Sequence, residues 1–451
     1  MAVWNIVNRT DFRSHANIMA EHYQLERIRA EEYLKSISTY RIKDLYKEVI
    51  QIISPSKLED SWNVYDLTDG ISNFLTTEPH YTKSSSAKKV AVENDFVISR
   101  LRSYLKEMAV VPNCNYKMAF STEYLVYRSK QSITASLLLP FSLSSYVQSI
   151  LKWAQMGNEH PRFSSETFGD IFIPNCILAH SNEISAYIAE AIECQKQSQA
   201  LYHQAETLLA KELQLDQLKL PNKKWYTANY CEVNKERRIN AEYFSPDVYC
   251  ILSQDFLKEA VTINDVFEII RGYTPKCYYR SGVPVVKTKN VRTPNVDKKR
   301  ISDYADSQEP LTQTKENDLI LAAMGVGSLG RMSYVTDKET NCAIDGTLRI
   351  LRKKDLSLND IEIPTMLFLS TEVGQKLIYR GISGTTGIIS LPDDYLGRIP
   401  IPVFEKSVRR KVTELVLNSI IAKNQSEQLL AQAKHRVEEL IEQEANKYKQ
   451  T

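Results

Sequence analysis

The stretch Gly169-Asp170-Ile171-Phe172-Ile173-Pro174 recurs as Gly397-Arg398-Ile399-Pro400-Ile401-Pro402, an offset of 228 residues from position 169 to position 397. Each copy is a short apolar run that closes on a proline, which is typical of a strand that ends there. Each is followed by a long charged segment rich in helix-forming residues. A strand exit followed by a helix, found twice, predicts an internal duplication of the chain.

Further matches extend the duplication in both directions. The same offset continues into the helical segments, and upstream it drifts, as expected if the loops differ in length. Four anchors in the same order favour a duplication over chance. The matched groups are Ser198, Leu201, Gln204 and Ala205 with Ser426, Leu429, Gln432 and Ala433; Glu93–Ile98 with Glu316–Leu321; and Ala20–Tyr23 with Ala241–Phe244.

The composition predicts two ordinary globular cores. The chain has 451 residues, of which 43% are hydrophobic and 25% are charged. Its net charge of +2 gives no global basic field, so any nucleic-acid surface must come from local clusters of Lys and Arg. The seven cysteines show no metal-ligand or disulfide spacing, which favours a reducing compartment.

No signal peptide or membrane span is expected from the sequence. The segment around Asp11, Arg13 and His15 lacks the apolar core of a signal peptide. The most apolar stretch, Ile133–Trp153, is interrupted by Pro140 and by several serines. We therefore expect a cytoplasmic protein.

The first block of the chain is expected to be α+β, and the second block repeats its plan. Spacing and turn residues predict the elements. For block one these are a helix at Ala16–Ile37, strands at Val49–Ile53, Val64–Leu67, Asp95–Ser99 and Tyr124–Tyr127, and helices within Ala135–Met156. For block two they are strands at Pro284–Lys287, Asp318–Ala322 and Leu348–Arg352, and a helix at Pro364–Ile378.

Two long helices are predicted, one after each block. The segment Cys176–Leu218 contains neither Gly nor Pro, and Pro221 is expected to end it. The second helix is expected at Val408–Tyr448. Small and apolar residues recur in both at spacings of three and four, which is the pattern of a coiled-coil seam.

Two glycine-rich loops in block two invite a nucleotide-binding interpretation. Gly325–Arg331 lacks the Gly-Lys-Ser/Thr ending, and the residues after Arg331 read as a strand, so a turn or a DNA-facing loop is favoured. The second loop, Gly381–Gly387, could hold backbone phosphates or be a plain surface turn. Asp247 with Asp297-x-Lys299 only loosely resembles a nuclease carboxylate set.

Basic residues cluster where loops are expected in both blocks. Clustered cations interleaved with Tyr, Ser and Asn suit phosphate contacts, with a few side chains left for base edges. A single cluster is more often a solvated face, but parallel placement in both blocks favours nucleic acid. The clusters are Lys287, Lys289, Arg292, Lys298, Lys299 and Arg300 in block two, and Lys88, Lys89, Arg100, Arg102, Tyr104 and Lys106 in block one.

Several motifs together resemble the specificity subunit of type I restriction-modification systems. They are Arg238–Tyr243, Gly272-x-Thr274-Pro275 followed by Gly282–Val286, Asn317–Ile320, Ile399–Pro402, and the long helix after each block. The resemblance implies two target-recognition domains in tandem, each followed by a long helix, with the two helices pairing as an antiparallel coiled coil. The implied boundaries are 1–177 and 221–404 for the recognition domains, and 178–220 and 405–451 for the spacer helices.

The resemblance also implies a function and partners. Each domain would read one half of a split site in double-stranded DNA, and the chain itself would carry no catalytic residue, metal or cofactor. Two methyltransferase subunits that use S-adenosylmethionine would dock on the helices, and a motor-nuclease subunit that uses ATP with Mg could join them. From placement we predict DNA contacts at Lys88, Lys89, Arg100, Arg102, Tyr104 and Arg162 in block one, and at Tyr273, Lys287, Lys289, Arg292, Ser328, Arg331, Thr385 and Thr386 in block two.

Other functions stay open at this point. The chain could serve a related phage-defence complex as its recognition subunit, or it could be a scaffold protein that binds no DNA. A self-contained nuclease or methyltransferase is disfavoured, because the sequence has neither an Asn-Pro-Pro-aromatic motif nor a methyltransferase glycine fingerprint.

Overall fold

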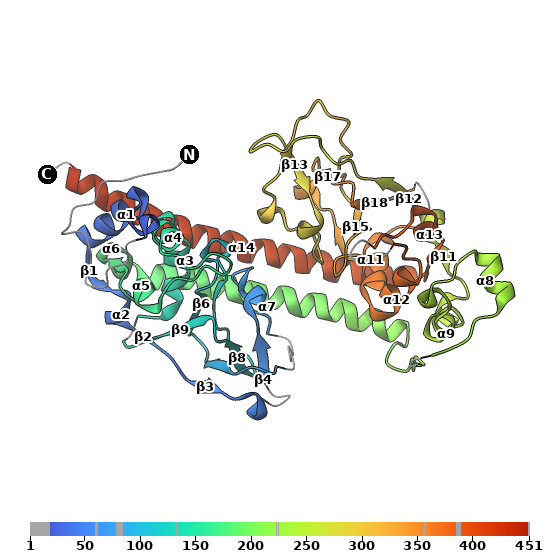
Figure 1. The fold of residues 1–451 in the computed structure, drawn as a ribbon, viewed down its shortest axis with the longest axis horizontal. Helices are drawn as coiled ribbons and strands as arrows, with labels where there is room; N and C mark the ends of the chain where they lie inside the picture. The colour runs from blue at the N-terminus through green and yellow to red at the C-terminus, as the bar shows by residue number, and fades with distance from the viewer. Residues whose placement is uncertain are drawn as a thin grey trace. The chain divides into compact units, whose positions relative to one another are not determined.

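The protein is described by a computed structural model that covers residues 19–58, 62–77, 84–131, 133–221, 223, 225–354, 358–384 and 389–449 (Figure 1). The chain divides into two compact units. Unit 1 comprises Met1–Gln199 and Ile421–Thr451, and unit 2 comprises Ala200–Ile420. The division falls within the two longest described helices, α7 (Ser181–Glu212) and α14 (Lys406–Lys449).

Unit 1 is built from short strands and helices that precede α7. Its elements are α1 (Leu25–Ser36), β1 (Ser38–Arg41), α2 (Ile42–Leu45), β2 (Tyr46–Glu48), β3 (Ile52–Ile53), β4 (Trp62–Tyr65), β5 (Lys88–Ala91), β6 (Phe96–Ser99), β7 (Met108–Val110), β8 (Lys117–Ser121), β9 (Tyr124–Ser129), α3 (Leu138–Leu143), α4 (Ser145–Trp153), α5 (Ser165–Gly169), β10 (Phe172–Pro174) and α6 (Asn175–Ala179).

Unit 2 repeats much of this order before α14. Its elements are α8 (Tyr230–Glu236), α9 (Pro246–Leu252), β11 (Val261–Thr262), α10 (Ile263–Val266), β12 (Phe267–Arg271), β13 (Val283–Val286), β14 (Tyr304–Ala305), β15 (Leu319–Ala322), β16 (Met332–Tyr334), β17 (Ala343–Ile344), β18 (Leu348–Lys353), α11 (Glu362–Ser370), α12 (Glu372–Arg380), α13 (Asp393–Arg398) and β19 (Pro400–Ile401).

The main sheet has the same antiparallel topology in both units. Its strand order is β2-β9-β6-β7 in unit 1 and β12-β18-β15-β16 in unit 2. A two-stranded antiparallel pair precedes it in each unit, β1 with β10 and β11 with β19. The exit strand quoted at the start of the sequence therefore pairs back onto the first strand of its own unit.

The second sheet is where the two units differ. In unit 1 its order is β3-β5-β8-β4, and in unit 2 it is β14-β13-β17. Both contain one parallel pair, β4 with β8 and β13 with β17. The additional strands lie on opposite sides of this pair, since unit 1 extends it beyond β8 and unit 2 beyond β13.

The turn that leads into the third strand of each main sheet is built in the same way. Asn94 and Asn317 adopt left-handed backbone conformations, with φ of 65° and 69°. The following aspartates, Asp95 and Asp318, are almost fully buried. Arg128 grips Asp95 with two hydrogen bonds of 2.7 Å, and Arg352 grips Asp318 with bonds of 2.9 and 2.7 Å. Planar guanidinium groups favour this bidentate geometry, so each pair ties the central strands together.

The long helices contribute to the core of both units. In unit 1, Ile188 of α7 and Val437 of α14 lie in one buried cluster, and Arg436 Nε lies 2.9 Å from Glu183 Oε1. Further along, Ser426 donates to Gln195 over 3.2 Å. Residue numbers on the two helices therefore run in opposite directions within this unit. In unit 2, one buried cluster joins α7 and the residue after it to α14. Its members from these segments include Ala205, Leu209, Leu213, Val412, Val416 and Ile420.

The first long helix is shorter than expected at both ends. His180 interrupts it, so α6 is separate from α7. It ends at Glu212, before the expected Pro221, and Gln214 follows in a left-handed conformation with a φ of 50°. Gln214 N donates to Lys211 O and Leu215 N donates to Ala210 O, which is the backbone pattern that terminates a helix.

Other expected elements are present with altered boundaries. The helix expected at Pro364–Ile378 is two helices, α11 and α12, separated at Thr371, whose hydroxyl accepts from Gly374 N and caps the second. Of the strand expected at Val49–Ile53, only Ile52–Ile53 form a strand, β3, and β2 ends before it at Glu48. The lead-in helix is described only from Ala20–Tyr23 and α1 onward. Within the described residues, no helix is long and apolar enough to cross a membrane.

Candidate nucleic-acid interface

The hairpin that joins the last two strands of each main sheet carries the strongest candidate residues. It spans 100–107 in unit 1 and 323–331 in unit 2. The hairpins open on equivalent hydrogen bonds, from Ser99 N to Glu107 O and from Ala322 N to Arg331 O. Arg331 of unit 2 therefore occupies the position that a buried glutamate, Glu107, holds in unit 1.

Glycines set the path of the unit 2 hairpin. Gly325, Gly327 and Gly330 have φ of 104°, 73° and 85°, which favour glycine. The amides of Gly325, Ser328, Leu329 and Gly330 donate to backbone carbonyls, so they are unavailable to a phosphate. This explains why the loop is a turn and not a nucleotide cradle. The predicted contact Ser328 also points inward, since its hydroxyl donates to the carbonyls of Met324 and Gly325.

Two arginines flank this hairpin without a carboxylate partner among the residues that the structure describes. Arg331 is exposed and donates from Nη2 to Gly327 O over 2.7 Å. Arg292 lies beside β16, where its amide donates to Ser333 Oγ over 2.8 Å. Burial of the Arg292 guanidinium, together with the nearby cations Arg331 and Arg300, lowers the pKa of Arg292, and Asp297 opposes this. Concentrated positive charge of this kind attracts an anion.

The two predicted lysines of unit 2 are held by one aspartate. Lys287 Nζ and Lys289 Nζ lie 3.3 and 3.2 Å from the two carboxylate oxygens of Asp303. Burial acts to raise the pKa of Asp303, but hydrogen bonds from Lys289, Lys287 and Ser302 outweigh it and leave that pKa lowered. Lys287 also lies 3.4 Å from the ring centroid of Tyr278. These lysines are therefore partly neutralised.

Tyr273 and Tyr278 lie in the segment that follows β12. The backbone at Gly272 passes close to Asp345, and a Cβ at position 272 would lie 2.1 Å from Asp345 O. Only glycine therefore fits at the start of this segment. Burial raises the pKa of Tyr278 to about 12, aided by its 3.0 Å hydrogen bond to Asp345. Tyr273 is half-buried. The other predicted residues here, Thr385 and Thr386, lie outside the described residues.

In unit 1, four of the five predicted cations are paired with acids. Arg100 and Arg162 both bind Glu123, at 2.9 Å each, and these hydrogen bonds, that from Arg162 first, lower the pKa of Glu123. Lys88 and Lys89 are wrong as loop contacts, because both lie on β5 and are buried. Lys88 lies 2.8 Å from Asp66, and Lys89 lies 3.8 Å from Glu48.

The unit 1 hairpin itself presents an aromatic side chain. Tyr104 is 64% exposed at its tip. Arg102 and Lys106 bracket the tip, both with left-handed backbones, and Arg102 Nη2 lies 3.3 Å from His160 Nδ1. The structure thus brings Arg102 and Tyr104 onto one hairpin, beside the paired Arg100 and Arg162.

Four residues of these sites could not be predicted from sequence patterns, namely Glu123, Asp303, Glu107 and Tyr278. Glu123 precedes β9 and reaches Arg162 from 39 residues away. Only the pairing of β9 with β6 brings it to the hairpin. No local signal in the sequence identifies such a partner.

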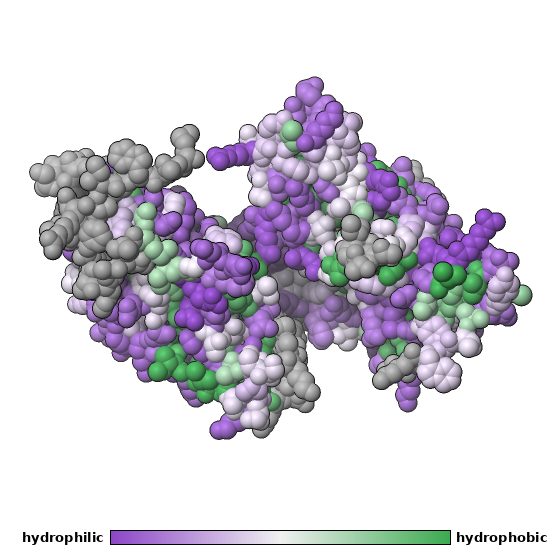
Figure 2. All heavy atoms as spheres, viewed as in Figure 1, coloured by the Kyte–Doolittle hydropathy of each residue, from purple (hydrophilic) through white to green (hydrophobic). Residues whose placement is uncertain are grey.

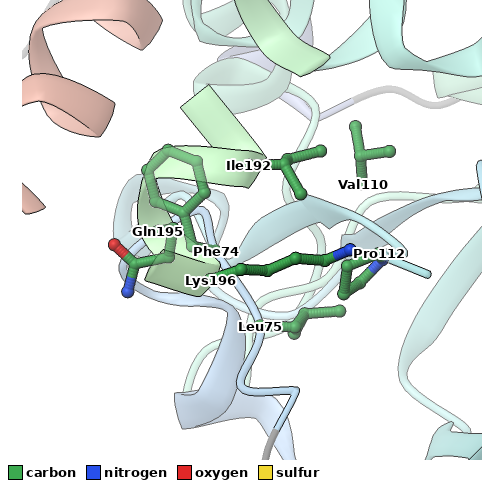
Figure 3. A pocket seen from close by; sticks show the side chains of 7 residues that line it. All are labelled: Phe74, Leu75, Val110, Pro112, Ile192, Gln195 and Lys196. Atoms are coloured by element: carbon green, nitrogen blue, oxygen red, sulfur yellow. The ribbon is translucent and has the colours of Figure 1, made fainter. Parts of the chain in front are cut away.

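The remaining surface offers hydrophobic features of a different kind. Figure 2 shows a hydrophobic patch over the β3 end of unit 1, where Ile50, Ile52 and Val92 are exposed. A small pocket in the same unit is lined by Phe74, Leu75, Val110 and Pro112 facing three residues of α7, Ile192, Gln195 and Lys196 (Figure 3). Its mainly apolar lining makes it a packing seam along α7, with no group suited to catalysis.

Comparisons with known proteins give fold likenesses at low identity. No protein-family model matches the chain, and no curated protein matches it. A type I restriction-modification S subunit from M. genitalium is similar with a TM-score of 0.41 and 12% identity, over 89% of this chain and 94% of that one.

Two further solved structures are similar to the chain. The HsdS subunit from Thermoanaerobacter tengcongensis has a TM-score of 0.29 and 15% identity, over 89% of this chain and 94% of that one. A structure described for complex assembly and conformational transition of the type I R-M system has a TM-score of 0.30 and 14% identity, over 89% and 95%. At these values the likenesses assign no role to any residue of this chain.

Proposed function

We propose that this chain is the non-catalytic sequence-specificity subunit of a type I restriction-modification complex. Its two units each read one half of a split DNA site through the hairpin face of the main sheet. The observation that carries the proposal is the same sheet built twice, with an arginine bound to a buried aspartate and a hairpin that carries cations in each copy.

The long helices supply the spacer in this proposal. We infer that α7 and α14 pair as an antiparallel coiled coil, which the opposed contacts of Glu183 with Arg436 and of Gln195 with Ser426 support. Helices of 32 and 44 residues extend about 48 and 66 Å at 1.5 Å per residue, which is on the order of one and a half to two turns of DNA. A spacer of this length would leave the DNA between the half-sites unread.

Catalysis belongs to partners in this proposal. Two methyltransferase subunits using S-adenosylmethionine would dock on the spacer helices, and a motor-nuclease subunit using ATP with Mg could join them in the cytoplasm. The recognition domains would correspond to 1–177 and 221–404, and the spacer helices to 178–220 and 405–451. A closely related variant is the same recognition role in another phage-defence complex.

A second candidate is a scaffold protein that binds no DNA. The neutralised cations of unit 1 favour it, because Glu123, Asp66 and Glu48 already satisfy the charges expected to meet phosphates. In that case the cationic hairpin of unit 2 would meet acidic protein surface.

Selection from a random pool tests the proposal. The full chain, purified with the proteins that accompany it in its host, is mixed with a pool of random duplex DNA, and the bound duplexes are sequenced. We expect two short sequence elements at a fixed separation, with affinity that falls steeply as salt rises. Recovery of no enriched sequence would refute DNA reading and favour the scaffold.

Charge-reversed variants identify the unit that reads each element. In the doubly substituted Arg292→Glu, Arg331→Glu chain, one of the two elements should lose its enrichment while the other persists. Lys258→Glu is the matched control, since Lys258 is an exposed cation of unit 2 that pairs only locally with Asp255. The control should recover both elements.

A further inference from the structure

The hairpin of unit 1 keeps an unfavourable backbone where its counterpart in unit 2 uses glycine. Arg102 and Lys106 have φ of 48° and 55°. Arg102 N donates to Pro161 O, as Gly325 N donates to Ile389 O, so Arg102 corresponds to Gly325. Lys106 precedes Glu107 as Gly330 precedes Arg331, so Lys106 corresponds to Gly330. Left-handed conformations are costly for residues with a Cβ.

The tip between these two residues is held rigidly. Asn73 Nδ2 donates to the carbonyls of Lys106 and Met108 over 2.9 and 3.0 Å. Ser103 is buried, and its hydroxyl donates to Leu151 O over 3.3 Å. Leu105 N closes the turn onto Arg102 O over 2.8 Å. The tip is therefore fixed from both sides, and its exposed members are Tyr104 and Leu105.

Two cationic residues stand two positions before and after Tyr104 on the hairpin. These are Arg102 and Lys106, and His160 adjoins Arg102. Lys106 is also near Lys434 of α14 within unit 1, with Glu438 as the opposing charge. Desolvation of its ammonium, then Lys434, lowers the pKa of Lys106. Such a rigid aromatic tip between positive charges has the chemistry of a base-stacking platform with phosphate contacts on either side.

We propose that Tyr104 stacks on a base of bound duplex DNA, with Arg102 and Lys106 on the adjacent phosphates. This rests on the proposed function and adds the mode of contact in unit 1. The side chains at the two strained positions supply the flanking charges that glycine would lack. Unit 2 has no ring at its own tip, where Val326 is exposed instead.

The test uses the duplex recovered from the random pool, with 2-aminopurine placed at each adenine position in turn. On binding of the unaltered chain with its accompanying proteins, we expect fluorescence to change at one position in the element read by unit 1, because the tyrosine ring replaces one stacking neighbour of that base. Tyr104→Ala should abolish this change and weaken binding about tenfold, while Tyr104→Phe should keep the change and the affinity. Tyr40→Ala, which removes an exposed tyrosine elsewhere in unit 1, is the control and should change neither.

Lys106→Gly separates binding from folding. Glycine tolerates the left-handed backbone, so thermal stability should stay the same or rise. The salt dependence of binding should fall by about one phosphate contact. Equal losses for Tyr104→Phe and Tyr104→Ala would overturn stacking in favour of a hydroxyl contact, and unaltered binding by Tyr104→Ala would overturn any role for the ring. If the unaltered chain enriches no sequence, DNA reading itself fails, and this proposal fails with it.

Discussion

Units 1 and 2 share a framework but differ in the charges placed on it. The main sheet, the left-handed asparagine and the arginine bound to a buried aspartate occur in both. At the hairpin base, unit 1 has Arg100, Glu123 and Arg162, and backbone hydrogen bonds show that unit 2 has Ala323, Thr347 and Ser390 at the same places. Unit 2 therefore lacks both the two cations and the acid that pairs with them. The framework is kept in both units while the charged residues on its surface differ.

The largest effect should come from breaking the shared framework. Arg352→Ala leaves the carboxylate of Asp318 buried without its cation, and Arg128→Ala does the same to Asp95. Only the carboxylates are buried, and the arginines are partly exposed, so each substitution should cost about 2 kcal/mol of unfolding free energy, less than loss of a fully buried pair. Urea denaturation should show this loss for both variants. Hydrogen exchange should place the loss in unit 2 for Arg352→Ala and in unit 1 for Arg128→Ala, and a loss spread across both units would show that the two units do not unfold independently.

A second substitution should destabilise unit 2 alone. Gly272→Ala places a Cβ 2.1 Å from the carbonyl oxygen of Asp345, and neither backbone can move freely. We expect a loss of about 2 kcal/mol in unfolding free energy, as for other overpacked sites. Gly327→Ala is the control for glycine loss, since its Cβ would meet nothing within 4 Å, although its positive φ still makes alanine mildly unfavourable. An equal effect of both substitutions would rule out the close approach as the cause.

Charge reversal sharpens the difference between paired and unpaired cations. Arg331→Glu should weaken DNA binding at least tenfold and lower its salt dependence by about one phosphate. Lys289→Glu should have a smaller effect, because Asp303 already offsets the lysine charge. Fluorescence anisotropy over a salt series measures both. Equal effects of the two reversals would contradict the distinction drawn here.

The smallest effect is expected from a substitution that makes the hairpin base of unit 1 more like that of unit 2. Glu123→Thr introduces the residue found at the equivalent place in unit 2 and releases Arg100 and Arg162 from their carboxylate. DNA affinity should rise about threefold, since two cations become available to phosphates. An unchanged or weaker affinity would show that these arginines do not face DNA.

The same variant has a predicted pH dependence. Because the pKa of Glu123 lies below its usual value of 4.5, the carboxylate stabilises the folded state above that pH and loses this contribution as the pH falls through the folded pKa. The stability difference between the unaltered chain and Glu123→Thr should therefore shrink on acidification below about pH 4.5. Thermal melting from pH 7 to pH 3 measures the difference, and a constant gap would assign it to another cause.

The repeated framework could be predicted because its determinants are local. Asn94-Asp95 and Asn317-Asp318 place a turn residue directly before a buried acid, and the sequence match of these segments reflects that shared turn. The exit strands and the second long helix also follow from local pattern. Helix α7 was overestimated because it ends in a left-handed turn at Gln214, and glutamine, unlike glycine or asparagine, gives no sequence signal of such an end.

The candidate site was predicted less well, because charge pairing is set by tertiary contacts. Arg331 and Arg102 were predicted to lie on loops, and both lie on the hairpin loops of the main sheets. Lys88 and Lys89 looked similar in sequence, but β5 pairs with β8 and turns them towards Asp66 and Glu48. Whether a lysine meets solvent or an acid 22 residues away depends on strand pairing.

Matching hydrogen bonds at the base of the two hairpins make each loop a transplantable part. The strands flanking 100–107 and 323–331 keep their own ladder contacts through Asn94 to Val111 and Asn317 to Val335. If either loop were grafted onto the other sheet, the backbone hydrogen bonds at both of its ends would match those of its own unit. Under the proposed function, the chain could acquire a new reading preference in one half by exchanging these loop residues, while the rest of its architecture stays as it is.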